Sequence, residues 1–248
     1  MVQASRFRDL LRQDGMVVAP GAYDCITAKL IEQAGFAAVY MTGAGTAATL
    51  GYPDFGLVTM SEMVRNAARI AAAVELPVVA DADTGYGNEL NVFRTVREYE
   101  KSGVAGIHIE DQEFPKKCGH LEGKQVIPRD EYTAKIRAAA AARRDPHFMI
   151  IARTDSRAVA GLDEAIARAN EALAAGADMA FVEAPQTLEE VAAVPRGSTG
   201  PASSMSCAAA RPPISISKKP RPWATSSPSY RGCFSRAPLG FASGCWPS

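Results

Sequence analysis

The chain has 248 residues, of which 47% are hydrophobic and 22% charged. This composition predicts one globular domain with a substantial core and excludes a disordered or fibrous protein. Basic and acidic residues number 27 each, so the overall charge gives no reason to expect a nucleic acid or a membrane surface as partner. The chain shows neither a secretory signal nor an apolar run of the ~20 residues that span a bilayer, and we expect a cytoplasmic protein.

The charge is distributed unevenly along the chain. All 27 acidic residues lie in residues 1–195, whereas residues 196–248 hold seven basic residues, no acidic residue and eight of the 16 prolines. We therefore divide the chain into a body, residues 1–195, and a tail, residues 196–248. A shifted reading frame near Arg196 would explain the change, and a basic extension rich in serine and proline, without fixed structure, is the alternative.

Six short apolar runs recur along the body, each too short for a helix, and we expect them to be strands. They are residues 16–19, 37–41, 78–81, 106–110, 149–154 and 179–183. Between them, apolar residues recur at helical spacing, as in residues 162–169. Gly35, Gly103 and Gly176 stand at similar helix-to-strand joints, where glycine lets the chain turn back. The pattern predicts β/α units around a parallel sheet.

Six such units fit a (β/α)8 TIM-type barrel of ~250 residues better than a five-stranded doubly wound sheet. The barrel needs two further strands, and these must come from the tail. The Arg211-Pro212-Pro213 segment and the similar residues 219–222 are hostile to buried strands. We therefore expect the region of strands 7 and 8 to be aberrant.

Acidic side chains follow two neighbouring strands, at the carboxyl ends where a barrel has its active site. Asp81 and Asp83 are two residues apart and face the same way on a strand, and Glu110 ends the next strand. Three acids without supporting His or Cys describe an oxygen-rich site for Mg²⁺ or Mn²⁺. In the alternative interpretation, Asp81 and Asp83 are turn and helix-capping residues and Glu110 pairs with an arginine.

The second strand leads into a loop of small residues that begins at Thr42. Its exposed amides could hold a carboxylate or phosphate, and the alternative is a tight turn. The loop also matches a dinucleotide-binding fingerprint, but Gly51 and Pro53 interrupt the long helix that such a motif requires, so nucleotide binding is not predicted.

Cys118 lies in a polar, glycine-containing stretch with Lys116, Lys117 and His120. These neighbours would lower the pKa of its thiol and favour a catalytic role, against the alternative of a small apolar side chain. The stretch is suited to a mobile lid.

Arg153 and Glu183 end the fifth and sixth strands. The guanidinium offers a clamp for a substrate carboxylate, and a bracing ion pair with Glu183 is the alternative. We place His108 on the face of its strand that contacts the helices.

Together these motifs resemble the isocitrate lyase and phosphoenolpyruvate mutase superfamily, in particular its 2-methylisocitrate lyase-like branch. The resemblance covers about residues 15–195. It rests on residues 40–45 (YMTGAG), 81–87 (DADTGYG), 109–112 (IEDQ), 116–120 (KKCGH) and 152–155 (ARTD).

This resemblance implies a (β/α)8 barrel, usually a homotetramer, that binds Mg²⁺ and a small carboxylate substrate. The implied metal site consists of Asp81 and Asp83, with Glu110 in its outer shell. The implied substrate-binding residues are Thr42, Gly43, Ala44, Asp54, Gly119, Arg153 and Glu183. The implied catalytic residues are Cys118, Tyr40, Lys116 and His120, with Cys118 as the acid that protonates the departing carbanion.

The expected activity is Mg²⁺-dependent carbon–carbon cleavage of a small 2-hydroxy polycarboxylate, of the 2-methylisocitrate or 2,3-dimethylmalate type, to pyruvate or glyoxylate and a dicarboxylate. The alternatives on the same scaffold are carboxyvinyl-carboxyphosphonate phosphorylmutase and oxaloacetate decarboxylase. A further alternative is an inactive frameshifted chain, because the family features expected after the sixth strand are not legible in the tail.

Overall fold

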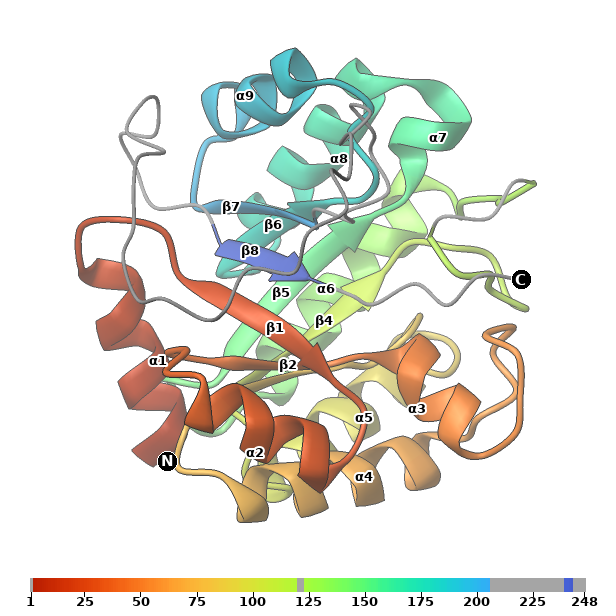
Figure 1. Ribbon diagram of the computed structural model, residues 1–248. Coiled ribbons are helices and arrows are strands. Elements are labelled where there is room, and N and C mark those ends of the chain that lie inside the picture. Colours follow the sequence, from red (N-terminus) through yellow and green to blue (C-terminus); the bar gives the residue numbers. More distant parts are fainter. Residues whose placement is uncertain (1, 120–122, 206–238, 243–248) are drawn as a thin grey trace, which may run out of the picture.

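The structure is a computed structural model that describes residues 2–119, 123–205 and 239–242 (Figure 1). His120 and most of the tail lie outside the described residues. The role expected of His120 and the frameshift hypothesis therefore stay predictions.

The described strands pair in parallel and in chain order to form a closed barrel. They are β1 (Val18–Ala22), β2 (Val39–Met41), β3 (Val78–Asp81), β4 (Gly106–Glu110), β5 (Met149–Thr154), β6 (Met179–Val182), β7 (Ala202–Met205) and β8 (Leu239–Ala242). The barrel closes where β8 pairs with β1, with Phe241 opposite Ala19. The predicted bounds of β3, β4 and β5 are confirmed, and β1, β2 and β6 differ by a few residues at their ends.

The expectation that the seventh and eighth strands would be aberrant is not confirmed. β7 pairs in parallel with β6, and β8 pairs in parallel with β7. Neither strand contains proline, because the Pro-rich segments that motivated the expectation lie between them in the sequence, outside the described residues. Pairing with β6 and β1 is a long-range interaction that local composition does not report.

Helices alternate with the strands and surround the barrel (Figure 1). They are α1 (Val2–Arg12), α2 (Cys25–Gln33), α3 (Gly43–Thr49), α4 (Met60–Ala73), α5 (Glu89–Lys101), α6 (Arg129–Ala142), α7 (Ser156–Ala160), α8 (Leu162–Ala174) and α9 (Leu188–Gly197). Several begin with a capping box. At α4, for example, the side chains of Thr59 and Glu62 each accept a hydrogen bond from the other residue's backbone amide. Asn88 caps α5, so Asp81 and Asp83 are not helix caps.

Two apolar layers follow from the alternation of side chains along the strands. Ile107 and Ile109 point outward and belong to the large cluster between the sheet and the helices. Val79 and Ile151 belong to a second cluster that also contains Phe7 of α1. Figure 1 shows α1 beside the amino ends of the strands, so it packs against the barrel at the end opposite the predicted acids.

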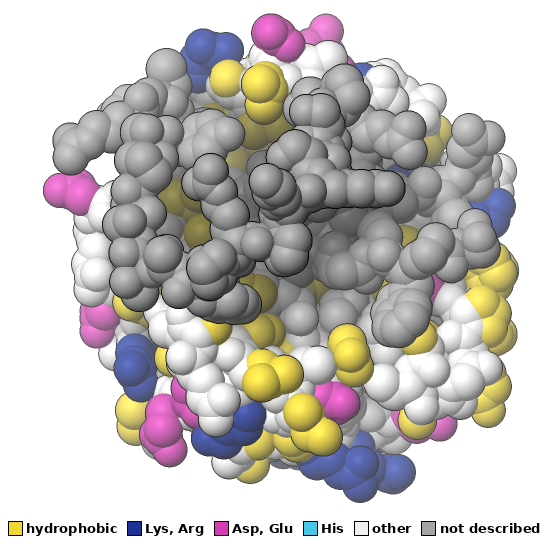
Figure 2. All heavy atoms as spheres, in the orientation of Figure 1, with side chains coloured by type: hydrophobic (Ala, Val, Ile, Leu, Met, Phe, Trp, Pro, Cys, Tyr) yellow, Lys and Arg dark blue, Asp and Glu magenta, His cyan; other side chains and the backbone are white. Residues whose placement is uncertain are grey.

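No helix among the described residues combines the length and the apolar character that crossing a bilayer requires. On the described part of the face shown in Figure 2, basic and acidic side chains are interspersed with apolar ones.

Candidate active site

The carboxyl ends of the strands bring most of the predicted site residues into one buried cluster. Asp81, Asp83, Glu110, Arg153, Glu183 and Lys116 are each at most 6% exposed. Charged side chains are rarely buried to this degree unless they are paired. We therefore expect the charges of this cluster, and not only its packing, to matter for what the site does.

Asp81, at the end of β3, is held by backbone amides. The Gly43 amide donates to its Oδ2 at 3.1 Å, and the Asp83 amide donates to its Oδ1 at 2.9 Å. A Cβ on Gly43 would lie 2.5 Å from Asp81 Oδ2, so only glycine allows this approach. Burial opposes ionisation, but His108, Lys116 and Arg153 lower the pKa of Asp81 to about 2. Asp81 is thus an ionised, preorganised carboxylate.

Lys116 lies between two carboxylates. Its Nζ is 2.6 Å from Asp83 Oδ1 and 2.5 Å from Asp54 Oδ1. Burial alone would lower the pKa of Lys116, but Asp83 and the other surrounding carboxylates raise it well above its usual range. Burial raises the pKa of Asp83 to about 6, although Lys116 opposes this rise. Lys116 is therefore a fixed positive charge rather than a group that exchanges protons near neutral pH.

The acids fit a hard divalent cation held by few protein ligands. Asp81 and Asp83 supply only oxygen, the ligand atom that Mg²⁺ prefers. Within the part of the chain that the structure describes, the buried Oε1 of Glu110 has no hydrogen-bond partner, and burial raises the pKa of Glu110 well above the usual value. A nearby cation would favour the ionised form of Glu110.

Within the described ranges, no three His, Cys, Asp or Glu side chains converge closely enough to hold one ion together. The assignment of Asp81 and Asp83 as the metal ligands, with Glu110 in the outer shell, stays a prediction.

Arg153, at the end of β5, connects three carboxylates. Its guanidinium forms two hydrogen bonds with Asp155, at 3.0 and 3.2 Å. It also lies 3.3 Å from Glu110 Oε2 and 3.5 Å from Glu183 Oε2. The bracing interaction that we considered for Glu183 is thus present, but the bidentate partner is Asp155.

Asp155 is a site residue that the sequence analysis missed as a functional residue. Although burial opposes its ionisation, Arg153 and Lys124 hold the pKa of Asp155 below its usual value. Lys124 donates to Asp155 at 2.9 Å and also to the Gly119 carbonyl. Asp155 follows Arg153 by two residues, so the argument that grouped Asp81 with Asp83 would have found it.

The segment that carries Cys118 packs directly over this cluster. A Cβ on Gly119 would lie 2.4 Å from both Arg153 Nη2 and Glu183 Oε1. The amide of Cys118 donates to the Asp54 carbonyl at 3.2 Å, and the side chain is half-buried. Lys116, from which we expected a lower thiol pKa, instead binds Asp54 and Asp83, while Lys117 donates to the Gly123 carbonyl at 2.9 Å.

The loop of small residues after β2 forms the start of α3. Thr42 caps this helix by accepting a hydrogen bond from the Gly45 amide at 3.2 Å. The Gly43 amide is engaged by Asp81. The roles implied for Thr42, Gly43 and Ala44 in binding a substrate carboxylate stay predictions.

Tyr40 and His108 lie together inside the barrel. The Tyr40 hydroxyl is 2.8 Å from His108 Nε2 and 3.3 Å from Asp81 Oδ2. The placement of His108 toward the helices is therefore wrong: it is two residues from Glu110, so both side chains share the inner face of β4. Burial, followed by the charge of Asp81, raises the pKa of Tyr40 well above its usual value, so its hydroxyl is neutral near pH 7.

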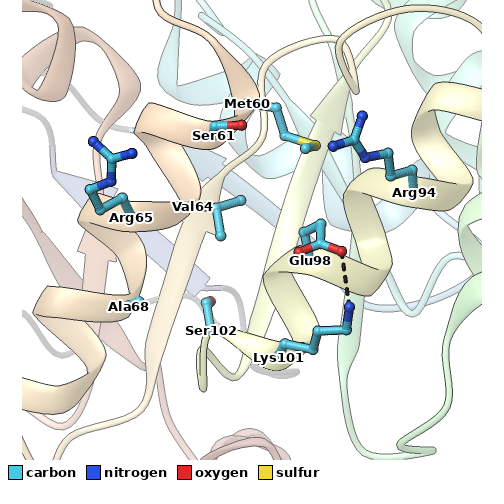
Figure 3. A pocket seen from close by; sticks show the side chains of 9 residues that line it. All are labelled: Met60, Ser61, Val64, Arg65, Ala68, Arg94, Glu98, Lys101 and Ser102. Carbon is cyan, nitrogen blue, oxygen red and sulfur yellow. Dashed lines mark hydrogen bonds and ion pairs between the residues drawn. The ribbon is translucent and has the colours of Figure 1, made fainter.

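A separate cavity lies outside the barrel, between α4 and α5 (Figure 3). Its volume is about 310 Å³, and Met60, Val64 and Arg94 are among its lining residues. Glu98 and Lys101 form an ion pair at 2.9 Å on its wall. None of the predicted site residues that the structure describes lines this cavity.

We expect Lys116→Met to bind Mg²⁺ ~10-fold more tightly at pH 8, because an ammonium group beside Asp83 repels a second cation. Turnover should fall at the same time, because the fixed charge over the site is lost. Isothermal titration calorimetry with MgCl₂ measures the affinity. Lys117→Met, which removes only a contact to a backbone carbonyl, is the control; weaker binding by Lys116→Met would contradict the expectation.

The cluster lies where TIM-barrel enzymes bind their substrates, at the carboxyl ends of a closed ring of parallel strands, and the chain has the fold of this class. The phosphoenolpyruvate phosphomutase family matches residues 7–217, and the chain belongs to this family. The superfamily resemblance stated from the motifs is thus confirmed.

The curated relatives have different activities. Over 192 residues the chain is 54% identical to 2,3-dimethylmalate lyase of Eubacterium barkeri, covering 77% of this chain and 66% of the relative. It is 47% identical over 201 residues to the chloroplastic carboxyvinyl-carboxyphosphonate phosphorylmutase of Arabidopsis thaliana, covering 79% and 59%. It is 49% identical over 183 residues to 2-methylisocitrate lyase of Aeropyrum pernix, covering 74% and 59%. The chain thus spans about two thirds or less of these relatives.

Solved structures show the same architecture. Oxaloacetate acetylhydrolase in complex with 3,3-difluorooxalacetate has a TM-score of 0.81 at 36% identity, covering 96% of this chain and 79% of that one. Phosphonopyruvate hydrolase in complex with oxalate and Mg²⁺ has a TM-score of 0.76 at 33% identity, covering 86% and 74%.

Proposed function

We propose that this protein is a Mg²⁺-dependent carbon–carbon lyase that cleaves a small 2-hydroxy polycarboxylate of the 2,3-dimethylmalate or 2-methylisocitrate type. The products would be pyruvate or glyoxylate and a dicarboxylate. The observation that carries the proposal is the segment of Cys118 and Gly119, which packs on a buried cluster of carboxylates and two fixed cations. The 54% identity to 2,3-dimethylmalate lyase supports the substrate class.

Asp81 and Asp83 would hold the Mg²⁺ ion, with Glu110 in the outer shell. When bound, the ion would polarise the hydroxy-acid end of the substrate and stabilise developing negative charge there. Arg153 supplies a guanidinium whose orientation is fixed by Asp155 and Glu183. A guanidinium in this state suits a substrate carboxylate, and its fixed geometry costs no reorganisation during the reaction.

Cleavage requires that the substrate hydroxyl lose its proton while the carbon–carbon bond breaks. We propose that the proton leaves toward the Tyr40 oxygen. Because the raised pKa of Tyr40 keeps the hydroxyl neutral, Tyr40 accepts this proton only as it passes its own to His108 Nε2, 2.8 Å away. The other fragment leaves as a carboxylate-stabilised carbanion, which the Cys118 thiol protonates. Packing of the segment at Gly119 over Arg153 would exclude water during this step.

Cys118→Ser is expected to lower turnover by ~10²–10⁴-fold, because a serine hydroxyl is a far weaker acid than a thiol. Mg²⁺ affinity should stay unchanged, since Cys118 is not among the proposed ligands. Coupled assays for pyruvate and glyoxylate measure the activity. Cys25→Ser, which changes the other described cysteine at the start of α2, is the control. Full activity of Cys118→Ser would remove the proposed role of the thiol.

The relative from Arabidopsis favours phosphorylmutase activity as a second candidate, and oxaloacetate decarboxylase is the further alternative on this scaffold. Parallel assays with Mg²⁺ and each substrate class, read by product identity, separate the three activities.

The proposed homotetramer is tested by light scattering of the purified protein. Translation of the encoding DNA in all three frames tests the frameshift hypothesis for residues 196–248, under which the chain would be inactive.

A further inference from the structure

His108 is enclosed inside the barrel next to the proposed reacting groups. Its side chain is 0% exposed, and the register of the sheet pairs its backbone with Asp81 on the adjacent strand. The rings of Tyr40 and Phe181 flank it: Tyr40 stacks with centroids 5.5 Å apart, and Phe181 makes an edge contact at 5.6 Å. The imidazole therefore has little freedom to rotate or shift.

The two ring nitrogens of His108 have different surroundings. Nε2 is 2.8 Å from the Tyr40 hydroxyl and 3.6 Å from Asp81 Oδ1. Nδ1 is buried and has no hydrogen-bond partner among the described residues. A buried ring nitrogen without a hydrogen bond is unfavourable, so packing holds the ring in an orientation that favours the Nε2 contact at the expense of Nδ1.

Among the described residues, His108 and Asp81 each place a polar atom close enough to the Tyr40 hydroxyl to influence its direction. A phenol hydroxyl rotates about its C–O bond, and its orientation follows the hydrogen bonds available to it. His108 Nε2 at 2.8 Å is closer than Asp81 Oδ2 at 3.3 Å. Without the imidazole nitrogen, Asp81 would remain as a competing partner and would draw the hydroxyl toward the proposed metal ligand.

We infer that His108 is a positioning residue, whose Nε2 fixes the direction of the Tyr40 hydroxyl and leaves the Asp81 carboxylate available to the metal. This inference rests on the proposed function, because the position of the hydroxyl matters for turnover only if Tyr40 takes part in proton transfer. His108 makes no contact with substrate in this role. It acts through Tyr40 alone.

Glutamine and asparagine at position 108 separate this role from simple packing. The amide of glutamine reaches the position of Nε2, whereas the amide of asparagine reaches only that of Nδ1. His108→Gln keeps the hydrogen bond and should retain more of kcat than His108→Asn, which should lose ~10–100-fold in kcat with KM nearly unchanged, because a directed hydrogen bond is lost. Equal activity of the two variants would overturn the inference. A higher kcat for His108→Asn than for His108→Gln would also overturn the inference.

A double-mutant cycle tests whether the effect passes through Tyr40. In a Tyr40→Phe background, His108→Asn should lower kcat by less than ~2-fold further, because the hydroxyl that His108 positions is already absent. A loss as large as that in the wild-type background would show that His108 acts by another route and would overturn the inference.

The contact is also measurable without activity, which covers the case in which His108→Asn does not fold. In protein with ¹⁵N-labelled histidine, Tyr40→Phe should shift the Nε2 resonance of His108 by more than that of Nδ1. An unchanged Nε2 resonance would refute the positioning contact. If the resonance shifts but the wild-type protein cleaves none of the candidate hydroxy acids, the contact stands and the proposed lyase function fails.

Discussion

Arg153→Met is expected to destabilise the protein by about 3–5 kcal/mol and to abolish turnover, because it leaves buried carboxylates without their cation. Glu110, Asp155 and Glu183 all lie within 3.5 Å of the guanidinium, and each is at most 1% exposed. Methionine fills much of the volume but carries no charge. Denaturant unfolding measures the stability, and the lyase assay measures turnover.

The matched control is Arg144→Met, which removes an exposed arginine in the loop after α6 and should change stability by less than ~0.5 kcal/mol. Arg153→Lys adds a graded comparison. It keeps the charge but loses the two-point contact with Asp155, so its stability should fall between those of the wild type and Arg153→Met. Wild-type stability of Arg153→Met would show that the three carboxylates do not depend on this guanidinium.

Asp81→Asn is expected to weaken Mg²⁺ binding by more than ~100-fold and to reduce turnover below ~1% of wild type, since loss of an outer-shell partner alone costs 10–100-fold. Asparagine has the same shape but lacks the negative charge, which Asp81 carries near neutral pH because its pKa is lowered to about 2. Its amide nitrogen would also face the donor groups of Gly43 or Asp83, which now donate to the carboxylate.

Calorimetry of Mg²⁺ binding and the product assay report on Asp81→Asn independently. Asp14→Asn, at an exposed position after α1, controls for the loss of one negative charge. Tight Mg²⁺ binding by Asp81→Asn would place the metal ligands elsewhere. Retained Mg²⁺ affinity together with lost turnover would reassign Asp81 to substrate binding.

Short stretches of sequence were sufficient to predict much of the candidate site. The bounds of β3, β4 and β5 were predicted because short apolar runs bounded by polar residues are a local signal. Asp81, Asp83 and Glu110 were grouped because parallel strands end at one edge and side chains alternate along each strand. Arg153 and Glu183 were placed beside them for the same reason.

Other features depended on contacts between residues far apart in the sequence. Lys116 binds Asp54, 62 residues away, a contact that the sequence analysis did not foresee. The error in placing His108 has a different, local cause. His108 lies two residues before Glu110 on β4, so the alternation of side chains that placed Glu110 inward also places His108 inward.

The sequence by itself determined the β/α order, the inner face of the central strands and the residue types at their carboxyl ends, because these follow from periodicities of two and 3.6 residues. Only the tertiary structure decided that β7 and β8 close the barrel and that Lys116 binds Asp54 and Asp83. These outcomes depend on which side chains and strand edges meet after closure, and the free energy of such long-range pairs is not encoded in any short window of residues.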